Sequence, residues 1–273
     1  MSDHLSDLVR KELDLHGHAF TFAVLRLIDR LQGRSKWRRD VQEFPVEVQG
    51  EGTHIDFLLS NIDWGAVMVA ECKRCDTTWI FARDPGASGK ERLVFEALIA
   101  KEGLHGTIEP EPGDALYSNR VYQIGVESPK STKNLEKAIA QVCRGVNGLI
   151  ELLSRRLGAL EPFQRRSANA SVEFMPVIFT TAKLAATDFN LADADLKTGK
   201  LPAEGFAARV LPWLFLQYNV SPALRHGLPM TGRVGRGPAA RLKDILALEY
   251  SRTIVIVGAE GIEEFLTAPH WDG

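Results

Sequence analysis

The chain has 273 residues and a formal net charge of -2, with 45% hydrophobic and 25% charged residues. This composition favours a sizeable core and excludes a uniformly basic nucleic-acid binder, so any nucleic-acid surface must come from local clusters of Lys and Arg. Three cysteines argue against a disulfide framework and favour a reducing, cytoplasmic location. No secretory signal and no apolar run of about 18 residues occurs, so we expect no membrane association.

The first part of the chain is typical of a helix followed by a meander of three strands. Apolar residues recur at helical spacing in the helix, and the turn "GEG" joins the first two strands as a hairpin. The predicted elements are a helix over 3–32 that Gly17 bends or divides, and strands over 43–49, 53–60 and 66–73.

The remainder predicts further mixed structure without a clean linker. In chain order we expect a helix in "GKERLVFEALIAKEG", a strand in "SNRVYQIGVES", a long helix from about 132 to 157 capped by Ser131 or Thr132, a strand over 172–181, an apolar run in "FAARVLPWLFLQYNV", a strand in "RTIVIVG" and a short helix in "AEGIEEFLTA". The chain is therefore predicted to be one elaborated α/β domain over residues 1–273.

The third predicted strand ends in two charged side chains on one face. Successive strand side chains alternate between faces, so Glu71 and Lys73 project together where the apolar part of the strand ends. On the preceding strand, alternation places Asp56 on the same face as Leu58 and opposite Phe57. Pairing of the two strands as neighbours then brings Asp56 beside Glu71.

Two carboxylates and one ammonium suit the hydrolysis of a phosphodiester. Carboxylates bind hard divalent cations such as Mg²⁺ through oxygen, and the backbone carbonyl of Cys72 would complete the protein's share of the ligands. Such a cation polarises a phosphoryl oxygen and acidifies a bound water. The ammonium of Lys73 would orient that water and offset charge that develops on the phosphate.

Asp56, followed after fourteen residues by Glu71-Cys72-Lys73, resembles the motif of the PD-(D/E)xK nucleases, the restriction-endonuclease-like superfamily. The predicted order of helix, three-strand meander, helix and strand also resembles the core of that superfamily. The resemblance covers about residues 1–80 and 130–181, which leaves an insertion over about 81–129 and a C-terminal extension of the mixed sheet over about 182–273. Ile55 stands where the motif's name has proline.

The resemblance implies a metal-dependent DNA endonuclease that uses Mg²⁺, with Mn²⁺ as a substitute. Asp56, Glu71 and the Cys72 carbonyl would bind the metal, and Lys73 would act at the attacking water. Restriction, phage defence or repair are the implied roles, and duplex cutting would require a homodimer or a protein partner. Two alternatives stay open: a catalytically inactive module on the same core that binds nucleic acid or protein, and an RNA-directed nuclease.

Three further residues are candidates for supporting the site. Glu47 lies on the first strand and could add a carboxylate. Gln141 lies in the long helix, where some members of the superfamily place a glutamine, and Glu12 lies in the first helix, where members often place a glutamate. An ordinary solvated side chain is the alternative for each of them.

Basic clusters supply candidate nucleic-acid contacts. Arg38 and Arg39 flank Trp37, and a glycine-rich stretch contains Arg233, Arg236 and Arg241. Affinity for nucleic acid comes largely from Lys and Arg at the phosphate backbone, so both clusters are candidate phosphate contacts. Each is equally well explained as a solvated surface.

Two other motifs are weaker. Asp195-Leu196-Lys197 repeats the acidic-x-lysine spacing, but it lies in a polar, turn-like stretch with no apolar strand before it, which indicates a chance match. Cys72 and Cys75 form a CxxC motif with no second pair of ligands, which argues against structural zinc.

Overall fold

The structure is a computed structural model that describes residues 2–15, 17–48, 50–83, 93–99, 104–108, 120–128, 133–161, 171–188, 194–201, 207–219 and 251–268. Its helices are α1 (Ser2–Leu15), α2 (His18–Arg30), α4 (Asn134–Ser154) and α7 (Ile262–Thr267), with 3-10 turns at Leu157–Leu160 and Ala259–Gly261. Its strands are β1 (Arg38–Val48), β2 (Glu51–Asn61), β3 (Ala66–Lys73), β4 (Thr78–Arg83), β5 (Phe95–Ile99), β6 (Leu104–Ile108), β7 (Val121–Tyr122), β8 (Ile124–Ser128), β9 (Ser171–Thr180), β10 (Lys183–Asp188), β11 (Ala208–Val210), β12 (Trp213–Asn219) and β13 (Ser251–Gly258).

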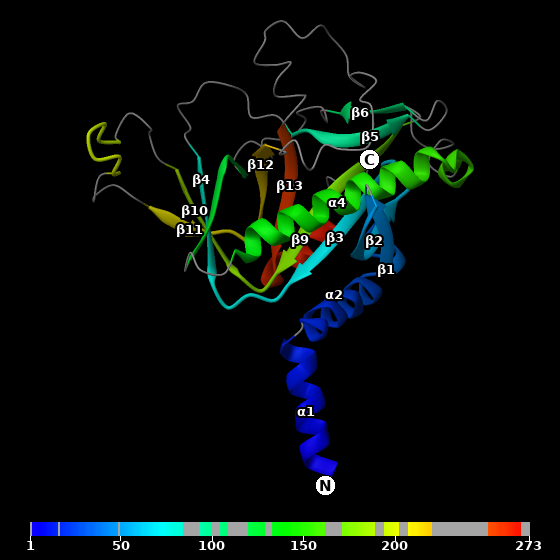
Figure 1. Ribbon diagram of the computed structural model, residues 1–273, viewed down its shortest axis with the longest axis horizontal. Coiled ribbons are helices and arrows are strands. Elements are labelled where there is room, and N and C mark those ends of the chain that lie inside the picture. The colour runs from blue at the N-terminus through cyan, green and yellow to red at the C-terminus, as the bar shows by residue number, and fades with distance from the viewer. Residues whose placement is uncertain are drawn as a thin grey trace, which may run out of the picture.

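A mixed sheet forms the centre of the molecule (Figure 1). Its main path runs β1-β2-β3-β9-β13-β12-β7, and β5 and β6 extend it from β9. β1, β2 and β3 form an antiparallel meander, whereas β3 and β13 both run parallel to β9. A second sheet has the order β11-β10-β4-β8.

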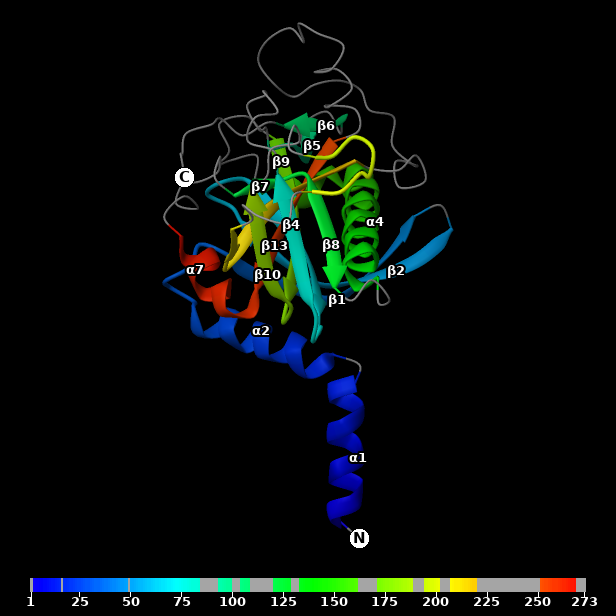
Figure 2. The same ribbon diagram turned by 90° about the vertical axis from the view of Figure 1, so that its left-hand side faces the viewer.

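Helices cover both faces of the central sheet, so its middle strands are apolar on both sides (Figures 1 and 2). α4 crosses one face, where Val146 and Ile150 pack with Val67 and Val69 of β3. On the other face, the apolar sides of α2 and α7 pack against β2, β3, β9 and β13. The two cores hold the ends of β2 and β3 in fixed positions.

α4 lies unusually close to the sheet because two glycines face it. A Cβ on Gly145 would lie 2.9 Å from Cγ1 of Ile55, and a Cβ on Gly148 would lie 2.8 Å from Cβ of Val46. Real Cβ contacts are essentially never that short, so the backbone of α4 occupies space that any other residue would need.

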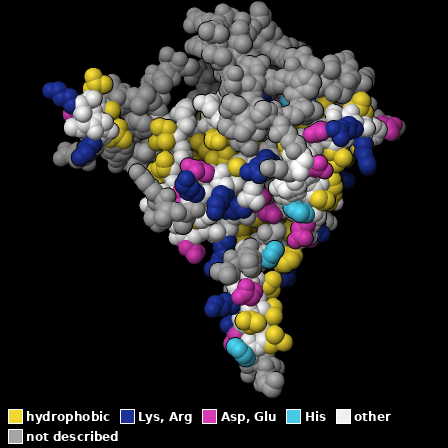
Figure 3. Space-filling model, in the orientation of Figure 1, with side chains coloured by type: hydrophobic (Ala, Val, Ile, Leu, Met, Phe, Trp, Pro, Cys, Tyr) yellow, Lys and Arg dark blue, Asp and Glu magenta, His cyan; other side chains and the backbone are white. Residues whose placement is uncertain are grey.

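α1 contributes little to the core. It extends away from the rest of the molecule (Figures 1 and 2). Leu5, Leu8, Val9 and Leu13 are 64%, 50%, 49% and 42% exposed, and Figure 3 shows them as an apolar band along this helix. Gly17, with φ of 77°, separates α1 from α2 as the sequence predicts.

The structure confirms a mixed α/β chain and corrects three local expectations. The expected helix in "GKERLVFEALIAKEG" is instead strand β5 where that stretch is described, because Phe95–Ile99 pairs with both β6 and β9. The strand expected in "SNRVYQIGVES" divides into β7 and β8, which belong to different sheets. The long helix begins later than expected, at Asn134, and Ser131 and Thr132, the expected caps, lie outside the described residues; the Glu127 carboxylate of β8 accepts hydrogen bonds from the backbone N–H groups of Asn134 and Leu135. None of the described helices is long and apolar enough to cross a membrane.

Candidate active site

The candidate site lies where β2 and β3 stop pairing. Their register runs from Asn61↔Ala66 to Phe57↔Ala70 and ends there. One residue further along β2, the Asp56 carboxylate Oδ2 accepts a hydrogen bond from the backbone N–H of Cys72 at 2.6 Å. A side chain therefore bridges the two strands where their ladder ends, and this fixes Asp56 against β3.

Glu71 and Lys73 project together from the end of β3, as alternation predicts. Val67 and Val69 pack on the α4 side, whereas Met68, Ala70 and Cys72 pack on the α2 side. The Lys73 Nζ donates to Glu71 Oε1 at 2.5 Å. Glu71 is only 4% exposed, whereas the Lys73 side chain is 23% exposed. The ammonium thus sits between a buried carboxylate and solvent.

Strict alternation fails on β2 at Asp56. Ile55 and Leu58 both pack in the α4-side core, although residues three positions apart on a regular strand point to opposite faces. Phe57 packs in the opposite core. The strand is therefore distorted at Asp56. Across from it, between the pairs Gln42↔Phe57 and Phe44↔Ile55, Glu43 has φ of 48°. Left-handed backbone is rare for a residue other than glycine.

The two carboxylates are close enough to influence each other. Burial and then the charge of Asp56 raise the pKa of Glu71 to about 7, against the opposing effect of Lys73. Burial also raises the pKa of Asp56, although the Cys72 hydrogen bond and the Lys73 charge lower it. Glu43 adds a smaller upward contribution to the pKa of Asp56. Burial and neighbouring carboxylates thus both disfavour the ionised form of Asp56 and Glu71, and Lys73 opposes them.

The first turn of α2 also reaches the site, which the sequence reasoning missed. The charge of His18 lowers the pKa of Asp56, and Thr21 hydrogen-bonds the Cys72 side chain. A Cβ on Gly17 would lie 3.7 Å from the Cβ of Arg74. The division of the first helix at Gly17 thus places the start of α2 over the end of β3.

The three proposed supporting residues occupy different places. Glu47 is exposed on β1, pairs with Gly52, and lies four residues beyond Glu43. Gln141 is half-buried on α4, one turn before Gly145 and hence on the helix face that packs against Ile55 and Val69. Glu12 is exposed on α1. Glu43 is instead the carboxylate that affects Asp56.

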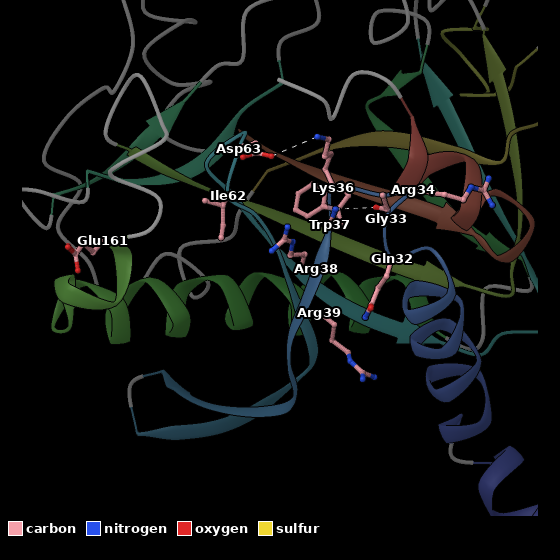
Figure 4. Close-up of a pocket in the computed structure, with 11 residues that line it drawn as sticks. Gln32, Gly33, Arg34, Lys36, Trp37, Arg38, Arg39, Ile62, Asp63 and Glu161 are labelled. Carbon is pink, nitrogen blue, oxygen red and sulfur yellow. Dashed lines mark hydrogen bonds and ion pairs between the residues drawn. The ribbon is translucent and has the colours of Figure 1, made fainter.

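The proposed nucleic-acid contacts divide into two groups. Arg38 and Arg39 begin β1 and line one pocket at the edge of the sheet (Figure 4). Arg233, Arg236 and Arg241 lie outside the described residues.

The weaker motifs have local structural roles. The Asp195 Oδ1 accepts hydrogen bonds from the backbone N–H groups of Lys197 and Thr198, both at 2.8 Å, which makes this acidic-x-lysine a capped, exposed turn.

The Cys75 Sγ lies 2.7 Å from Thr77 Oγ1, whereas Cys72 faces Thr21. The two cysteines therefore have separate environments.

The donor set fits a hard cation. Asp56 and Glu71 offer carboxylate oxygens, the ligand type that Mg²⁺ prefers, and a positive ion would offset the burial that raises both pKa values and the charge of Asp56 that adds to the rise for Glu71. Within the described part of the chain, no three His, Cys, Asp or Glu side chains gather into a metal-binding group. The protein's contribution would thus be two carboxylates and backbone oxygen.

Comparison with protein-family models, with curated proteins and with solved structures gives no match for this chain.

Proposed function

We propose that this chain is a Mg²⁺-dependent DNA endonuclease of the PD-(D/E)xK type. One observation carries the proposal: Asp56 is fixed against β3 by the Cys72 N–H, beside the Glu71–Lys73 ion pair. Two neighbouring carboxylates that can hold a divalent cation and one ammonium suit metal-assisted phosphodiester hydrolysis.

The arrangement of elements supports the same reading. With the insertion β4–β8 set aside, the order α2-β1-β2-β3-α4-β9 supports the core that the resemblance implies, helix, three-strand meander, helix and strand. Mn²⁺ would substitute for Mg²⁺ because both take oxygen ligands. Restriction, phage defence or repair are the settings in which such an activity would serve.

Each residue has a distinct task in the proposed reaction. A bound divalent cation supplies charge neutralisation and a water of lowered pKa. Asp56 and Glu71 hold the cation, and the hydrogen bond from Cys72 orients Asp56 for that purpose. Lys73 places its ammonium at the partly exposed side of Glu71, where it would contact the attacking water or the phosphate. Gln141, on the α4 face toward the sheet, is the candidate for a further water contact.

The test is cleavage of plasmid and linear DNA by the purified chain in Mg²⁺ or Mn²⁺. Wild-type protein is expected to nick or cut the DNA. Asp56→Ala and Lys73→Ala are each expected to lower the rate by at least about 100-fold, the size of effect seen when one group that stabilises transition-state charge is removed. Lys197→Ala, in the chance acidic-x-lysine, is the matched control and should cut at the wild-type rate.

The outcomes separate the alternatives. Cutting by both Asp56→Ala and Lys73→Ala at the wild-type rate would show that the site is elsewhere. Cleavage of RNA and not DNA would establish the RNA-directed nuclease. DNA binding without cleavage in either metal would favour the inactive binding module.

A further inference from the structure

A basic pocket lies at the edge of the central sheet, between the end of α2 and the start of β1. Its cavity is about 930 Å³. Four cations line it, namely Arg34, Lys36, Arg38 and Arg39, together with the carboxylates of Asp63 and Glu161. Figure 4 shows that the cations come from one continuous segment, whereas Glu161 lies apart from them, at the end of the segment that follows α4. The pocket therefore has an excess of positive charge.

The existing ion pairs of these cations are weak enough to be exchanged. The nitrogen-to-oxygen distance is 2.9 Å between Arg34 Nη1 and Glu263 Oε1. It is 3.9 Å between Lys36 Nζ and Asp63 Oδ2, and 3.2 Å between Arg39 Nη2 and Asp29 Oδ2. Their side chains are 66%, 49% and 36% exposed, and exposed ion pairs contribute about 0–1 kcal/mol. No described residue forms an ion pair with Arg38, which is exposed.

The backbone that carries the cations is held firmly. Ser35 Oγ donates to the carbonyl of Leu266 at 2.7 Å and accepts from the Trp37 N–H at 3.1 Å. Trp37 is 2% exposed and packs edge-on against Trp64 at 6.2 Å between ring centroids. Because Trp37 anchors the segment in the core, the backbone from which the cations project is fixed before any ligand arrives.

The pocket lies at a defined distance from the candidate active site. α2 begins beside Asp56 and ends at the pocket, and its 13 residues span about 20 Å. Along the sheet, Arg39 pairs with Leu59, three residues or about 10 Å from Asp56. Phosphates of one DNA strand advance about 3.4 Å along the axis per nucleotide. For a duplex whose axis runs along this line, the separation corresponds to about three to six nucleotides.

We propose that this pocket binds a backbone phosphate of the DNA strand, about three to six nucleotides from the phosphate at the carboxylates. The inference rests on the proposed function for the position of the cut, but the binding itself needs no cleavage. Arg38, which Figure 4 shows turned toward the side of Ile62, carries the contact, and Arg34, Lys36 and Arg39 add positive charge around it.

The first experiment measures binding without cleavage. Fluorescence anisotropy with a labelled 25-base-pair duplex in EDTA gives Kd as a function of salt for wild type and for the double variant Arg38→Ala/Arg39→Ala. The double variant is expected to bind about tenfold more weakly, with the salt slope reduced by about one, the change for one lost phosphate contact. Arg10→Ala, which removes an exposed arginine from α1, is the control and should keep both values. Arg38→Ala alone breaks no described ion pair, so its effect reports on the DNA and not on folding.

The second experiment locates the phosphate. A duplex with one uncharged methylphosphonate linkage is cut by wild-type protein in Mg²⁺, and the products are mapped. Cutting is expected to be suppressed at positions three to six nucleotides from the neutral linkage, and the double variant should lose this pattern. Equal Kd and equal salt slope for wild type and double variant, or no binding by wild type, would overturn the pocket. Binding that depends on Arg38 and Arg39 without any cutting would keep the pocket and overturn only the nuclease.

Discussion

Two buried glutamates show what the site adds to simple burial. Glu71 and Glu173 both have a pKa raised to about 7, and burial is the largest cause in each case. For Glu173 burial is the whole cause, and its Oε2 has no hydrogen-bond partner among the described residues. Glu71 has in addition the charge of Asp56 and the ion pair with Lys73. A raised pKa alone therefore does not mark the site; the neighbouring charges do.

Glu173 gives a prediction about stability and pH. Its pKa is raised in the folded state, so the unfolded chain releases this proton first as the pH rises above about 4.5, and the free energy of unfolding falls until about pH 7. Glu173→Gln removes that loss. The unfolding free energy of the variant minus that of wild type should therefore be larger at pH 8 than at pH 4.5. The expected increase is on the order of 2 kcal/mol once the shift is discounted for the partial exposure of Glu173.

Urea denaturation at the two pH values measures this difference. Glu47→Gln replaces an exposed strand carboxyl and is the matched control, for which little change between the two pH values is expected. A Glu173→Gln variant whose gain over wild type is the same at both pH values would contradict the assignment.

At the residue scale, the sequence predicts the site's main partners and misses Glu43 and the first turn of α2. Hairpin pairing of β2 with β3 and alternation on β3 bring Asp56, Glu71 and Lys73 together, because both depend on local strand geometry, whereas alternation on β2 fails at Asp56. Glu43 was within reach of the same reasoning: a hairpin that turns at residues 49–50 places residue 43 opposite residue 56. Its positive φ and the distortion of β2 at Asp56 are not signalled by the sequence: Ile55 and Leu58 pack in one core and Phe57 in the other, which a local pattern does not reveal.

At the scale of elements, local pattern fails where distant segments decide the outcome. "LVFEALIA" has the composition of either a helix or a strand, and pairing with β9 and β6 selects the strand. Likewise, α4 takes its first-turn hydrogen bonds from Glu127 of β8, which no capping pattern in the sequence signals. The long, strongly periodic segments of α2, α4 and β9 are predicted well because their burial pattern is complete within the segment.

Close packing of α4 on the meander gives a prediction for its glycines. In Gly148→Ala, the new Cβ would lie 2.8 Å from the Cβ of Val46, an atom next to the backbone that moves little. Overpacking costs about 1–3 kcal/mol, and the better helix propensity of alanine offsets about 1 kcal/mol of it. We expect Gly148→Ala to lower the unfolding free energy by about 1 kcal/mol.

Thermal and urea melts of Gly148→Ala beside Gly158→Ala provide the comparison. A Cβ on Gly158 meets nothing within 4 Å, so the second variant should be at least as stable as wild type. Equal stability of the two variants would mean that α4 can move away from β1 at no cost.

For the whole molecule, the sheet joins segments that the sequence presents as separate. The resemblance draws its core from about residues 1–80 and 130–181, yet β13 pairs in parallel with β9 and places the C-terminal strands beside the core. In the sheet, β12 lies on the other side of β13 from β9, and α7 covers the same sheet face as α2. Periodicity indicates that residues 252–258 form a buried strand but carries no information about the strand beside it. The pairing of β13 with β9 can therefore be seen only in the structure.

This closure predicts opposite results for truncations at the two ends. A chain ending at residue 188 loses β12, β13 and α7, which exposes the edge of β9 and removes Val255, Val257 and Phe265 from a core that they share with α2. It should fail to unfold cooperatively. A chain starting at Gly17 loses only α1, whose residues 4–13 are all exposed, and should melt within a few degrees of the full chain. Circular dichroism and calorimetry of both truncated chains measure these transitions. A cooperative transition in the chain ending at residue 188 would show that β9 and the meander form an independent unit. Loss of folding in the chain starting at Gly17 would assign α1 a structural role that its exposure does not indicate.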